Sequence, residues 1–428
     1  MEETATPVTT PAEVAQDAAP GGLGRIFRPL AGRDFRLLFI GETISLLGDQ
    51  FHFIALAWLT LEITGSGLAL GTVLLVAGLP RALLVLVGGV AADRFSPRTI
   101  MLGSNSIRAL IVGVLTLMIV TGTVELWMLY ILAFLFGAVD AFFWPAQGAI
   151  VPMLVDEDQL PGANGLMQGS QQLTGLIGPA LAGILVAAVG TAWAFGIDAI
   201  SFAVASLALA LIVGGRRRTV IGEHQPGVLR TIRSGLSYAW QDPAIRSLIL
   251  LSTALNFAIS GPISVGIAWM ANNQFEGGAQ AFGFILAAFG AGALLGAIVA
   301  GSLGAVRQLG WLSIIGSIVM GIALALVAIA PTALGVMILA LFIGLAAGFL
   351  NVRIVAWLQK RTPGDMMGRV MSLVMLGGIA LSPLSMALTG ALVDLGYVAL
   401  CFIGGGFLIV LAAFLGVAWG VPTHMREG

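Results

Sequence analysis

Apolar stretches of about 20 residues alternate with short polar or Gly/Pro-containing breaks along most of the chain. A membrane-spanning helix needs about 20 consecutive apolar residues, because the hydrocarbon core of a bilayer is about 30 Å thick. Twelve such stretches predict twelve transmembrane helices and an all-α membrane protein. They cover residues 35–61, 67–91, 98–120, 125–148, 165–189, 193–213, 245–270, 279–303, 309–330, 333–358, 366–389 and 397–420.

The longest polar break covers residues 214–244 and divides the twelve stretches into six and six. It predicts one six-helix bundle over 35–213, an inter-bundle loop over 214–244 and a second six-helix bundle over 245–420. The halves resemble each other, because "PGANGLMQGS" before the fifth stretch is followed about 205 residues later by "DMMGRVMSL" before the eleventh. Two similar halves are typical of membrane transporters.

Basic residues predict the orientation of the chain. Lys and Arg outside the stretches fall in the two tails and in alternate breaks, whereas breaks such as "EITGSG", "TGTVEL" and "VDLG" contain neither. By the positive-inside rule, both termini lie in the cytoplasm. Residues 1–34 are then a disordered cytoplasmic N-tail and residues 421–428 a cytoplasmic C-tail, with no apolar signal-peptide segment at the start.

The composition excludes several classes of protein. With 58% hydrophobic and 10% charged residues and a mean hydropathy of +1.01, the chain differs from soluble proteins, which have about 25% charged residues. Twenty basic and 21 acidic residues leave no basic excess for nucleic acid. One cysteine and three histidines offer no zinc or redox motif, and no GxxxxGK[ST] motif is present for a nucleotide. We therefore expect no cofactor, no metal and no enzymatic activity. The expected partners are membrane lipid, protons and a small-molecule substrate, and we expect the protein to be a monomer.

Ionisable residues inside the first four apolar stretches are the candidate functional residues. Each costs at least about 2.5–3.5 kcal/mol near the centre of a membrane helix, so such groups usually face a cavity. On a helix, two carboxylates and the imidazole of the first stretch fall on one face. Asp49 lies nearer the membrane midplane than the others. The candidates for proton coupling or substrate binding are Glu42, Asp49, His52, Arg81, Arg108 and Asp140.

The charge count predicts a proton or cation site. Three carboxylates face two guanidinium groups, so one carboxylate is left over, and a buried carboxylic acid can bind a proton whereas arginine cannot release one. Asp49 is the best candidate to stay unpaired, although it could instead form a structural hydrogen bond. Glu42 could pair with an arginine, and the Arg108–Asp140 pair could be structural or a gate. His52 could be an interior hydrogen-bonding group, and Arg81 could order the kink at the preceding proline.

Uncharged polar and aromatic residues within the apolar stretches could line a cavity. Asn256 and Asn351 are isolated amides in apolar surroundings, and "FFWP" places Phe142, Phe143 and Trp144 near Asp140. An aromatic wall beside a spare acid suits bulky amphiphiles, including cations. Each aromatic ring could instead pack against lipid or a neighbouring helix.

The break "GGVAADRFSPRTIM" (88–101) resembles the loop motif of the major facilitator superfamily. Gly89, Asp93, Arg94 and Arg98 match the motif. The resemblance implies the major facilitator fold and a charge latch between the two bundles at this loop.

The fifth stretch resembles the helix motif of exporters in this superfamily and implies a place at the interface of the two halves. The matching positions are Gly165, Thr174, Gly178, Pro179 and Gly183, with Thr174 where glycine is usual. "SLLGDQF", "ITGSGLALG", "FFWPAQGAIVP" and "GRVMSL" are similar to the macrolide-efflux and enterobactin-exporter branch.

Together these features predict a secondary active transporter in a bacterial inner membrane. It would export a lipophilic or amphiphilic small molecule by alternating access, with proton antiport. Alternatives are a facilitator or importer of the same fold, or a transporter of lysolipid-type amphiphiles. A membrane enzyme or sensor is the least supported, because the chain offers no nucleophile–base set.

Overall fold

The computed structural model describes residues 26–213, 237–303 and 308–419, and these form helices and connections with no strand. The first half contains the short helices η1 (Arg28–Ala31) and η2 (Glu157–Gln159) and six long ones. The long helices are α2 (Arg33–Thr64), α3 (Gly67–Arg94), α4 (Pro97–Val120), α5 (Leu126–Leu154), α6 (Leu160–Val189) and α7 (Thr191–Leu211).

The second half contains the helices α9 to α16 and one short π-helical segment, η3 (Pro262–Gly266), and residues 237–241 before α9 are also helical. The helices are α9 (Pro243–Gly261), α10 (Ile267–Asn273), α11 (Gly278–Ser302), α12 (Leu309–Val327), α13 (Ala333–Arg361), α14 (Gly364–Ala380), α15 (Ser382–Asp394) and α16 (Val398–Ala418). By length and composition, 11 helical segments of the described chain are suited to cross a membrane.

Two of the predicted helices are interrupted. The seventh becomes α9, η3 and α10 in succession, and the eleventh is divided at Leu381 into α14 and α15. A proline lies at each interruption: Pro262 is the first residue of η3, and Pro383 is the second residue of α15. Proline lacks an amide N–H and its ring clashes with the preceding turn, so it disturbs a helix interior. Residues 366–389 therefore differ from the single continuous helix that their apolar pattern predicts.

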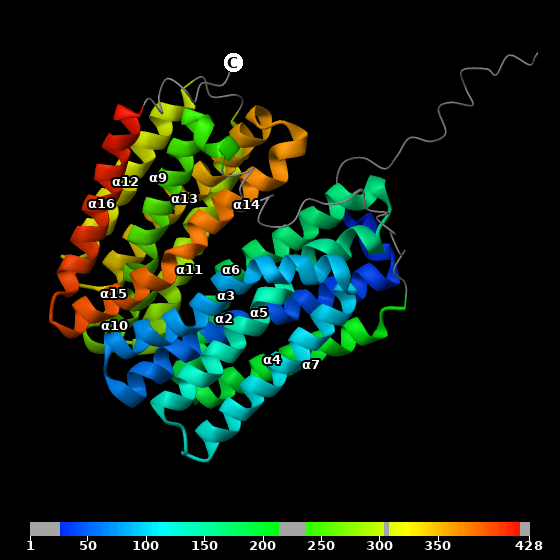
Figure 1. The fold of residues 1–428 in the computed structure, drawn as a ribbon. Helices are drawn as coiled ribbons and strands as arrows, with labels where there is room; N and C mark the ends of the chain where they lie inside the picture. Colours follow the sequence, from blue (N-terminus) through cyan, green and yellow to red (C-terminus); the bar gives the residue numbers. More distant parts are fainter. Residues whose placement is uncertain (1–25, 214–236, 304–307, 420–428) are drawn as a thin grey trace, which may run out of the picture.

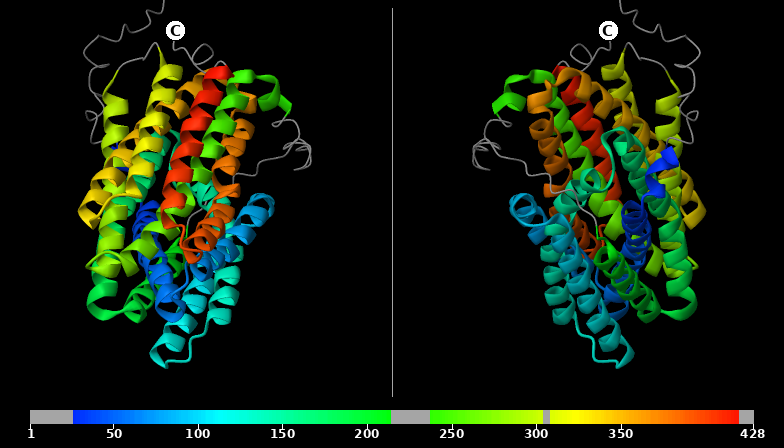
Figure 2. Two further views of the ribbon diagram at one scale, coloured as in Figure 1. Left: turned by 90° about the vertical axis from the view of Figure 1, so that its left-hand side faces the viewer. Right: turned by 90° about the vertical axis from the view of Figure 1, so that its right-hand side faces the viewer.

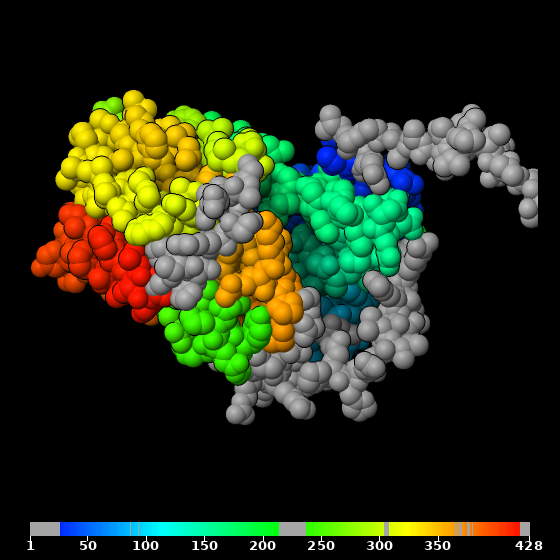
Figure 3. Space-filling view, turned by 90° about the horizontal axis from the view of Figure 1, so that it is seen from above, coloured from blue at the N-terminus to red at the C-terminus, as the bar shows by residue number. Residues whose placement is uncertain are grey.

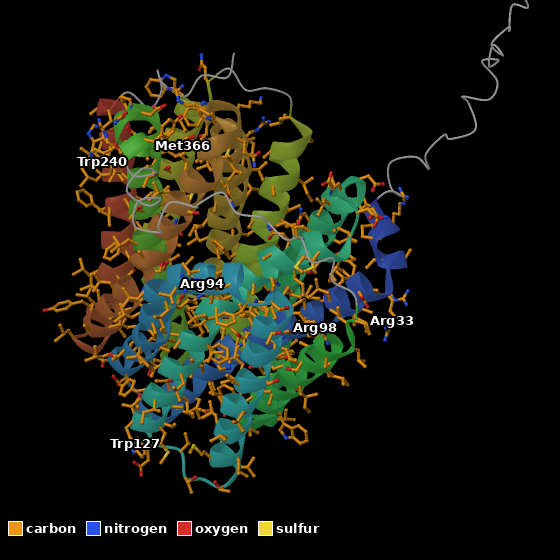
Figure 4. The ribbon with its side chains drawn as sticks, turned by 45° about the vertical axis from the view of Figure 1, so that its right-hand side comes forward. Arg33, Arg94, Arg98, Trp127, Trp240 and Met366 are labelled. Carbon is orange, nitrogen blue, oxygen red and sulfur yellow. The ribbon has the colours of Figure 1, made fainter. Side chains whose placement is uncertain are left out.

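The helices form two bundles, α2 to α7 on one side and α9 to α16 on the other (Figures 1 and 2). We call the end of the bundles near Arg33 the terminal end, and the end near Trp127 the hairpin end; these residues lie at opposite ends of the first bundle (Figure 4). Large apolar side chains such as Leu110, Ile200 and Phe414 are exposed on the outer faces, as expected for surfaces in contact with lipid.

The two bundles contact each other through small residues in their hairpin halves. A Cβ atom on Gly71 of α3 would overlap the backbone of Met386 and Ala387 in α15. A Cβ atom on Gly283 of α11 would likewise overlap the backbone of Pro179 in α6. Small residues allow helix backbones to approach this closely in a membrane, so α3–α15 and α6–α11 form the bundle interface.

Toward the terminal end the bundles diverge (Figure 1). The last of these glycine contacts are Gly78 with Pro383 and Gly290 with Gly175. Figure 3, which looks onto the terminal end, shows a recess between α14 (orange) and α6 (teal). The bundles are therefore closed against each other at the hairpin end and open at the terminal end.

Candidate functional site

The centre of the first bundle holds a carboxylate that binds two arginines. Nε of Arg81 in α3 lies 3.0 Å from Oδ2 of Asp140 in α5, and Nη1 of Arg108 in α4 donates to Oδ1 at 3.1 Å. The side chains of Arg108 and Asp140 are 2% and 8% exposed, whereas that of Arg81 is 41% exposed. Arginine stays charged when buried, so Arg108 requires the anion of Asp140.

Aromatic rings surround the buried guanidinium of Arg108. Its Cζ atom lies 4.1 Å from the ring centroid of Phe143 and 4.6 Å from that of Phe202. Such contacts attract a cation through the negative face of the ring. Two rings of the predicted aromatic stretch contact the arginines, and a cavity-lining role for the stretch stays a prediction. Phe143 is buried under Arg108, and Trp144 lies 5.8 Å from Cζ of Arg81. Phe142, beside the close approach of α5 to Gly88, is half-buried.

Glu42 of α2 is buried in the same layer without an arginine partner among the described residues. Gln147 of α5 donates to its Oε2 atom at 2.9 Å, and its Oε1 atom has no hydrogen-bond partner there. Asn105 of α4 accepts from Nη2 of Arg108 at 2.6 Å, while its own Nδ2 is left without a partner. The predicted alternative of a Glu42–arginine pair is therefore wrong. The sequence analysis did not select Asn105 and Gln147, although a side-chain amide within an apolar stretch could have indicated each of them.

Asp49 of α2 is half-buried, and within the described part of the chain it makes no hydrogen bond or ion pair. The titratable groups whose charge acts on it are Arg108, Asp198, Asp140 and His52. The charge count predicts one carboxylate without a guanidinium partner, but the structure leaves two, Asp49 and Glu42. The reason is that both arginines converge on Asp140.

His52 pairs with a carboxylate that the candidate set did not include. Its Nδ1 atom lies 3.0 Å from Oδ2 of Asp198 in α7, and its ring stacks on Phe136 at a centroid distance of 4.4 Å. The side chain of Asp198 is fully buried and also lies close to Ser201. An acid within the sixth apolar stretch was the available signal. This contact agrees with the interior hydrogen-bonding role considered for His52, and a role in proton transfer stays a prediction.

The close approach of α2 and α7 brings this pair together. A Cβ atom on Gly48 would overlap Oδ1 of Asp198 and Oγ of Ser201. A small apolar cavity, with room for about one water molecule, lies beside His52 between α4 and α5. Asp49, His52 and Asp198 thus form one polar group on the hairpin side of the Asp140 cluster.

Among the loop-motif residues whose side chains the structure describes, Arg98 binds within its own bundle. Arg98 donates through Nε to the carbonyl of Leu209 and through Nη2 to that of Ala210, both at 2.8 Å, at the end of α7 in its own bundle. Gly89 has open space around it, and Arg94 is exposed at the end of α3 (Figure 4). The side chain of Asp93 lies outside the described residues. Arg98 therefore makes no described contact with the second bundle in this state, and the charge latch at this loop stays a prediction.

The residues of the exporter helix motif lie on α6 but face different neighbours. Gly178 faces Gln50 of α2 within the first bundle, whereas Pro179 and Gly183 face α11 of the second. Gly165 has no neighbour within 4 Å of a Cβ position. Thr174 is buried, and its hydroxyl donates to the carbonyl of Ser170 in its own helix. α6 therefore links the polar helix α2 with the interface of the bundles.

The two isolated amides do not join the charged cluster. Asn256 of α9 is exposed, donates to the carbonyl of Ser252 and lies beside Gly378 of α14. Asn351 is exposed on α13. Charged groups and amides of the described membrane helices therefore concentrate in the first bundle.

The chain is similar over most of its length to bacterial efflux proteins and to a transporter of known structure. The chain is 26% identical over 387 residues to macrolide efflux protein A of Streptococcus pyogenes, covering 89% of this chain and 94% of that protein. It is 26% identical over 399 residues to the enterobactin exporter EntS of Escherichia coli, covering 92% and 93%. The crystal structure of a bacterial homolog of the human lysosomal transporter Spinster, inward-facing and unoccupied, matches with a TM-score of 0.70 at 14% identity, covering 95% and 100%.

These relatives are transporters, and the apolar helices make this chain a multi-pass membrane protein. The profile of the transmembrane secretion effector family, a branch of the major facilitator superfamily, matches residues 25–427. Because this match covers almost the whole chain and agrees with the two-bundle fold, the protein belongs to the transmembrane secretion effector family of the major facilitator superfamily.

Proposed function

We propose that this protein is a secondary active exporter of lipophilic or amphiphilic small molecules, driven by proton antiport across a bacterial inner membrane. The observation that carries the proposal is the pair of carboxylates on α2, Glu42 and Asp49, that lack a guanidinium partner among the described residues. The relatives that export macrolides, multiple drugs or enterobactin support the direction and the cargo class.

The coupling follows from competition for a carboxylate. Removing an anion from water is costly unless a counter-charge or a proton compensates it. Asp140 has its counter-charges, whereas Asp49 does not and is still partly exposed. Cargo that brings positive charge or hydrogen-bond donors to Asp49 replaces its proton, and the proton replaces the cargo on the other side. In each conformation Asp49 therefore binds either the proton or the cargo.

Coupled transport also requires that the site open to one side of the membrane at a time. The bundles are closed at the hairpin end and open at the terminal end, which is one of the two states that such a cycle needs. With the terminal end in the cytoplasm, as the basic residues predict, this state receives cargo from inside the cell. Arg81, Arg108 and Asp140 hold α3, α4 and α5 together during the motion, and Glu42 and His52 border the coupling residue.

The test is proton release on cargo binding. Purified protein in weakly buffered detergent solution is mixed with erythromycin or tetraphenylphosphonium, and the pH is recorded. The parent should release protons, and inside-out vesicles should accumulate the same probe when a proton gradient is applied. Asp49→Asn, which resembles the protonated acid, should bind probe but lose proton release and accumulation. Glu42→Gln should reduce transport less.

The matched control is Glu125→Gln, because Glu125 is an exposed carboxylate of the α4–α5 connection, far from the cluster. It should behave like the parent. Parent-like proton release and transport by Asp49→Asn would show that coupling lies elsewhere, with Glu42, the other carboxylate without a guanidinium partner among the described residues, as the next candidate. Probe efflux from the same vesicles would indicate an importer, and accumulation without dependence on the gradient would indicate a facilitator.

A further inference from the structure

The first turn of α3 is capped by a residue of the other bundle. Asp394, the last residue of α15, accepts hydrogen bonds from the amide of Gly67 at 2.6 Å and from that of Leu68 at 3.2 Å. The hydroxyl of Ser66 donates to its Oδ2 atom at 2.5 Å and accepts from the amide of Ala69 at 3.0 Å. Three of the amides that a helix start leaves without intrahelical partners are thus satisfied by Asp394 and Ser66.

The position of Asp394 makes these bonds depend on the bundle interface. They join residues 326–328 positions apart, at the hairpin end of the α3–α15 contact. Just beside them, Gly67 touches Val393, and Gly390 lies against the backbone of Gly67 and Leu68. A carboxylate at a helix N-terminus is also attracted by the helix dipole. Because hydrogen bonds weaken steeply with distance, separating the bundles here would break all three contacts of Asp394 at once.

The second interface lacks an equivalent polar contact in the described chain. There α6 and α11 contact each other through small residues and a proline: Gly175, Pro179 and Gly183 on α6, and Ala279, Gly283 and Gly290 on α11. The described residues of these two helices make no hydrogen bond with each other. At the hairpin end, van der Waals contacts therefore hold the α6–α11 interface together, whereas the carboxylate of Asp394 also holds the α3–α15 interface.

We propose that Asp394 is a clasp that holds the hairpin end closed and so favours the terminal-open conformation. The proposal rests on the alternation between two states in the proposed function, but it concerns the equilibrium between these states and needs neither cargo nor a proton gradient. In the terminal-closed state α15 moves away from α3, and water takes the place of the carboxylate at Gly67 and Leu68.

Thiol labelling can measure this equilibrium even when the open state is rare. Leu74 is buried on α3, about two helical turns after Gly67, and lies on the same face as Gly71 and Gly78, which contact α15. It therefore becomes accessible when the hairpin end opens. In a Cys401→Ala background, the introduced thiol of Leu74→Cys reacts with a maleimide at a rate proportional to the hairpin-open population. The native Cys401, buried within the second bundle, reports unfolding in the otherwise unchanged chain.

Asp394→Ala should accelerate labelling of Leu74→Cys by about two- to fivefold, the effect of one exposed carboxylate at a helix N-terminus. Asp394→Asn, which keeps one acceptor oxygen, should have a smaller effect. Glu276→Gln removes an exposed carboxylate from the same end of the same bundle and should leave the rate unchanged.

Two results would overturn the proposal. One is an unchanged labelling rate at Leu74→Cys in Asp394→Ala. The other is an equal acceleration at Cys401, because Asp394 would then stabilise the fold as a whole. If Asp394→Ala unfolds, Asp394→Asn decides by the same two criteria. A failure of the export assay would not affect this measurement, so the two proposals are tested separately.

Discussion

Asp140 should be the most important charged residue for stability in the first bundle. Asp140→Asn would leave Arg108 buried, since its side chain is 2% exposed, with only an amide in place of the carboxylate. Removing one partner of a buried ion pair costs about 3–5 kcal/mol, because the other charge remains desolvated. The aromatic rings around Arg108 recover only part of this, about 0.5–2 kcal/mol. We expect the free energy of unfolding to fall by about 3 kcal/mol.

Substitution of Arg81 and of Arg108 should lower the free energy of unfolding by different amounts. The side chain of Arg81 is 41% exposed, so solvent screens its pair with Asp140, and Arg81→Gln should cost about 1 kcal/mol or less. Arg108→Gln should cost more than Arg81→Gln but less than Asp140→Asn, because Asp140 keeps Arg81 as a partner. The double variant Arg108→Gln/Asp140→Asn should be more stable than Asp140→Asn alone, since it removes the uncompensated charge.

Equilibrium unfolding in dodecyl maltoside micelles with increasing sodium dodecyl sulfate measures these differences in one set of experiments. Near-ultraviolet circular dichroism and tryptophan fluorescence should give coincident transitions, which establishes two-state behaviour. Equal losses for Arg81→Gln and Arg108→Gln would refute the reasoning from burial. A double variant whose loss equals the sum of the single losses would show that the pair is not coupled.

Three further outcomes are expected. A reporter enzyme fused after Gly428, or inserted within residues 214–236, should be cytoplasmic, and an external location for either would contradict the predicted topology. Asp93→Asn should fold normally but alter the ratio of terminal-open to terminal-closed conformers in spin-label distance measurements; an unaltered ratio would reduce Asp93 to a solvated charge. Burial raises the pKa of Asp242, but the hydrogen bond from Arg361 and those from the start of α9 outweigh it, so the pKa is lowered. Its contribution to stability is therefore present above the unfolded value of about 3.9 and lost as the pH falls through the lower folded value. Asp242→Ala should lower the unfolding free energy by about 1 kcal/mol at pH 7 and by progressively less as the pH falls below about 3.9, measured by chemical denaturation.

The apolar pattern was sufficient to predict the helices of the membrane fold. In lipid, every backbone amide and carbonyl must be satisfied within its own segment, so an apolar stretch of sufficient length has few alternatives to a helix. The same pattern placed Glu42, Asp49 and His52 on one face of α2, because side-chain direction along a helix follows from spacing alone. It did not predict the division between α14 and α15, since a proline in a membrane helix can bend it, divide it or be tolerated.

The pairing of charges was decided by the tertiary structure. Depth along each helix suggested that Glu42 could meet an arginine, but depth does not fix the rotation of one helix against another. The packing of α3 and α4 onto α5 turned both Arg81 and Arg108 toward Asp140.

Contacts between distant parts of the chain were also beyond sequence reasoning. His52 meets Asp198 across 146 residues, and Asp394 meets Gly67 across 327. Both contacts exist because residues without a bulky side chain, Gly48 in one case and Gly67 with Gly390 in the other, let two backbones approach. Sequence alone therefore determined which segments are helices and which residues are polar within them. Helix packing decided which polar groups meet, because a hydrogen bond or ion pair needs its partners within about 3 Å.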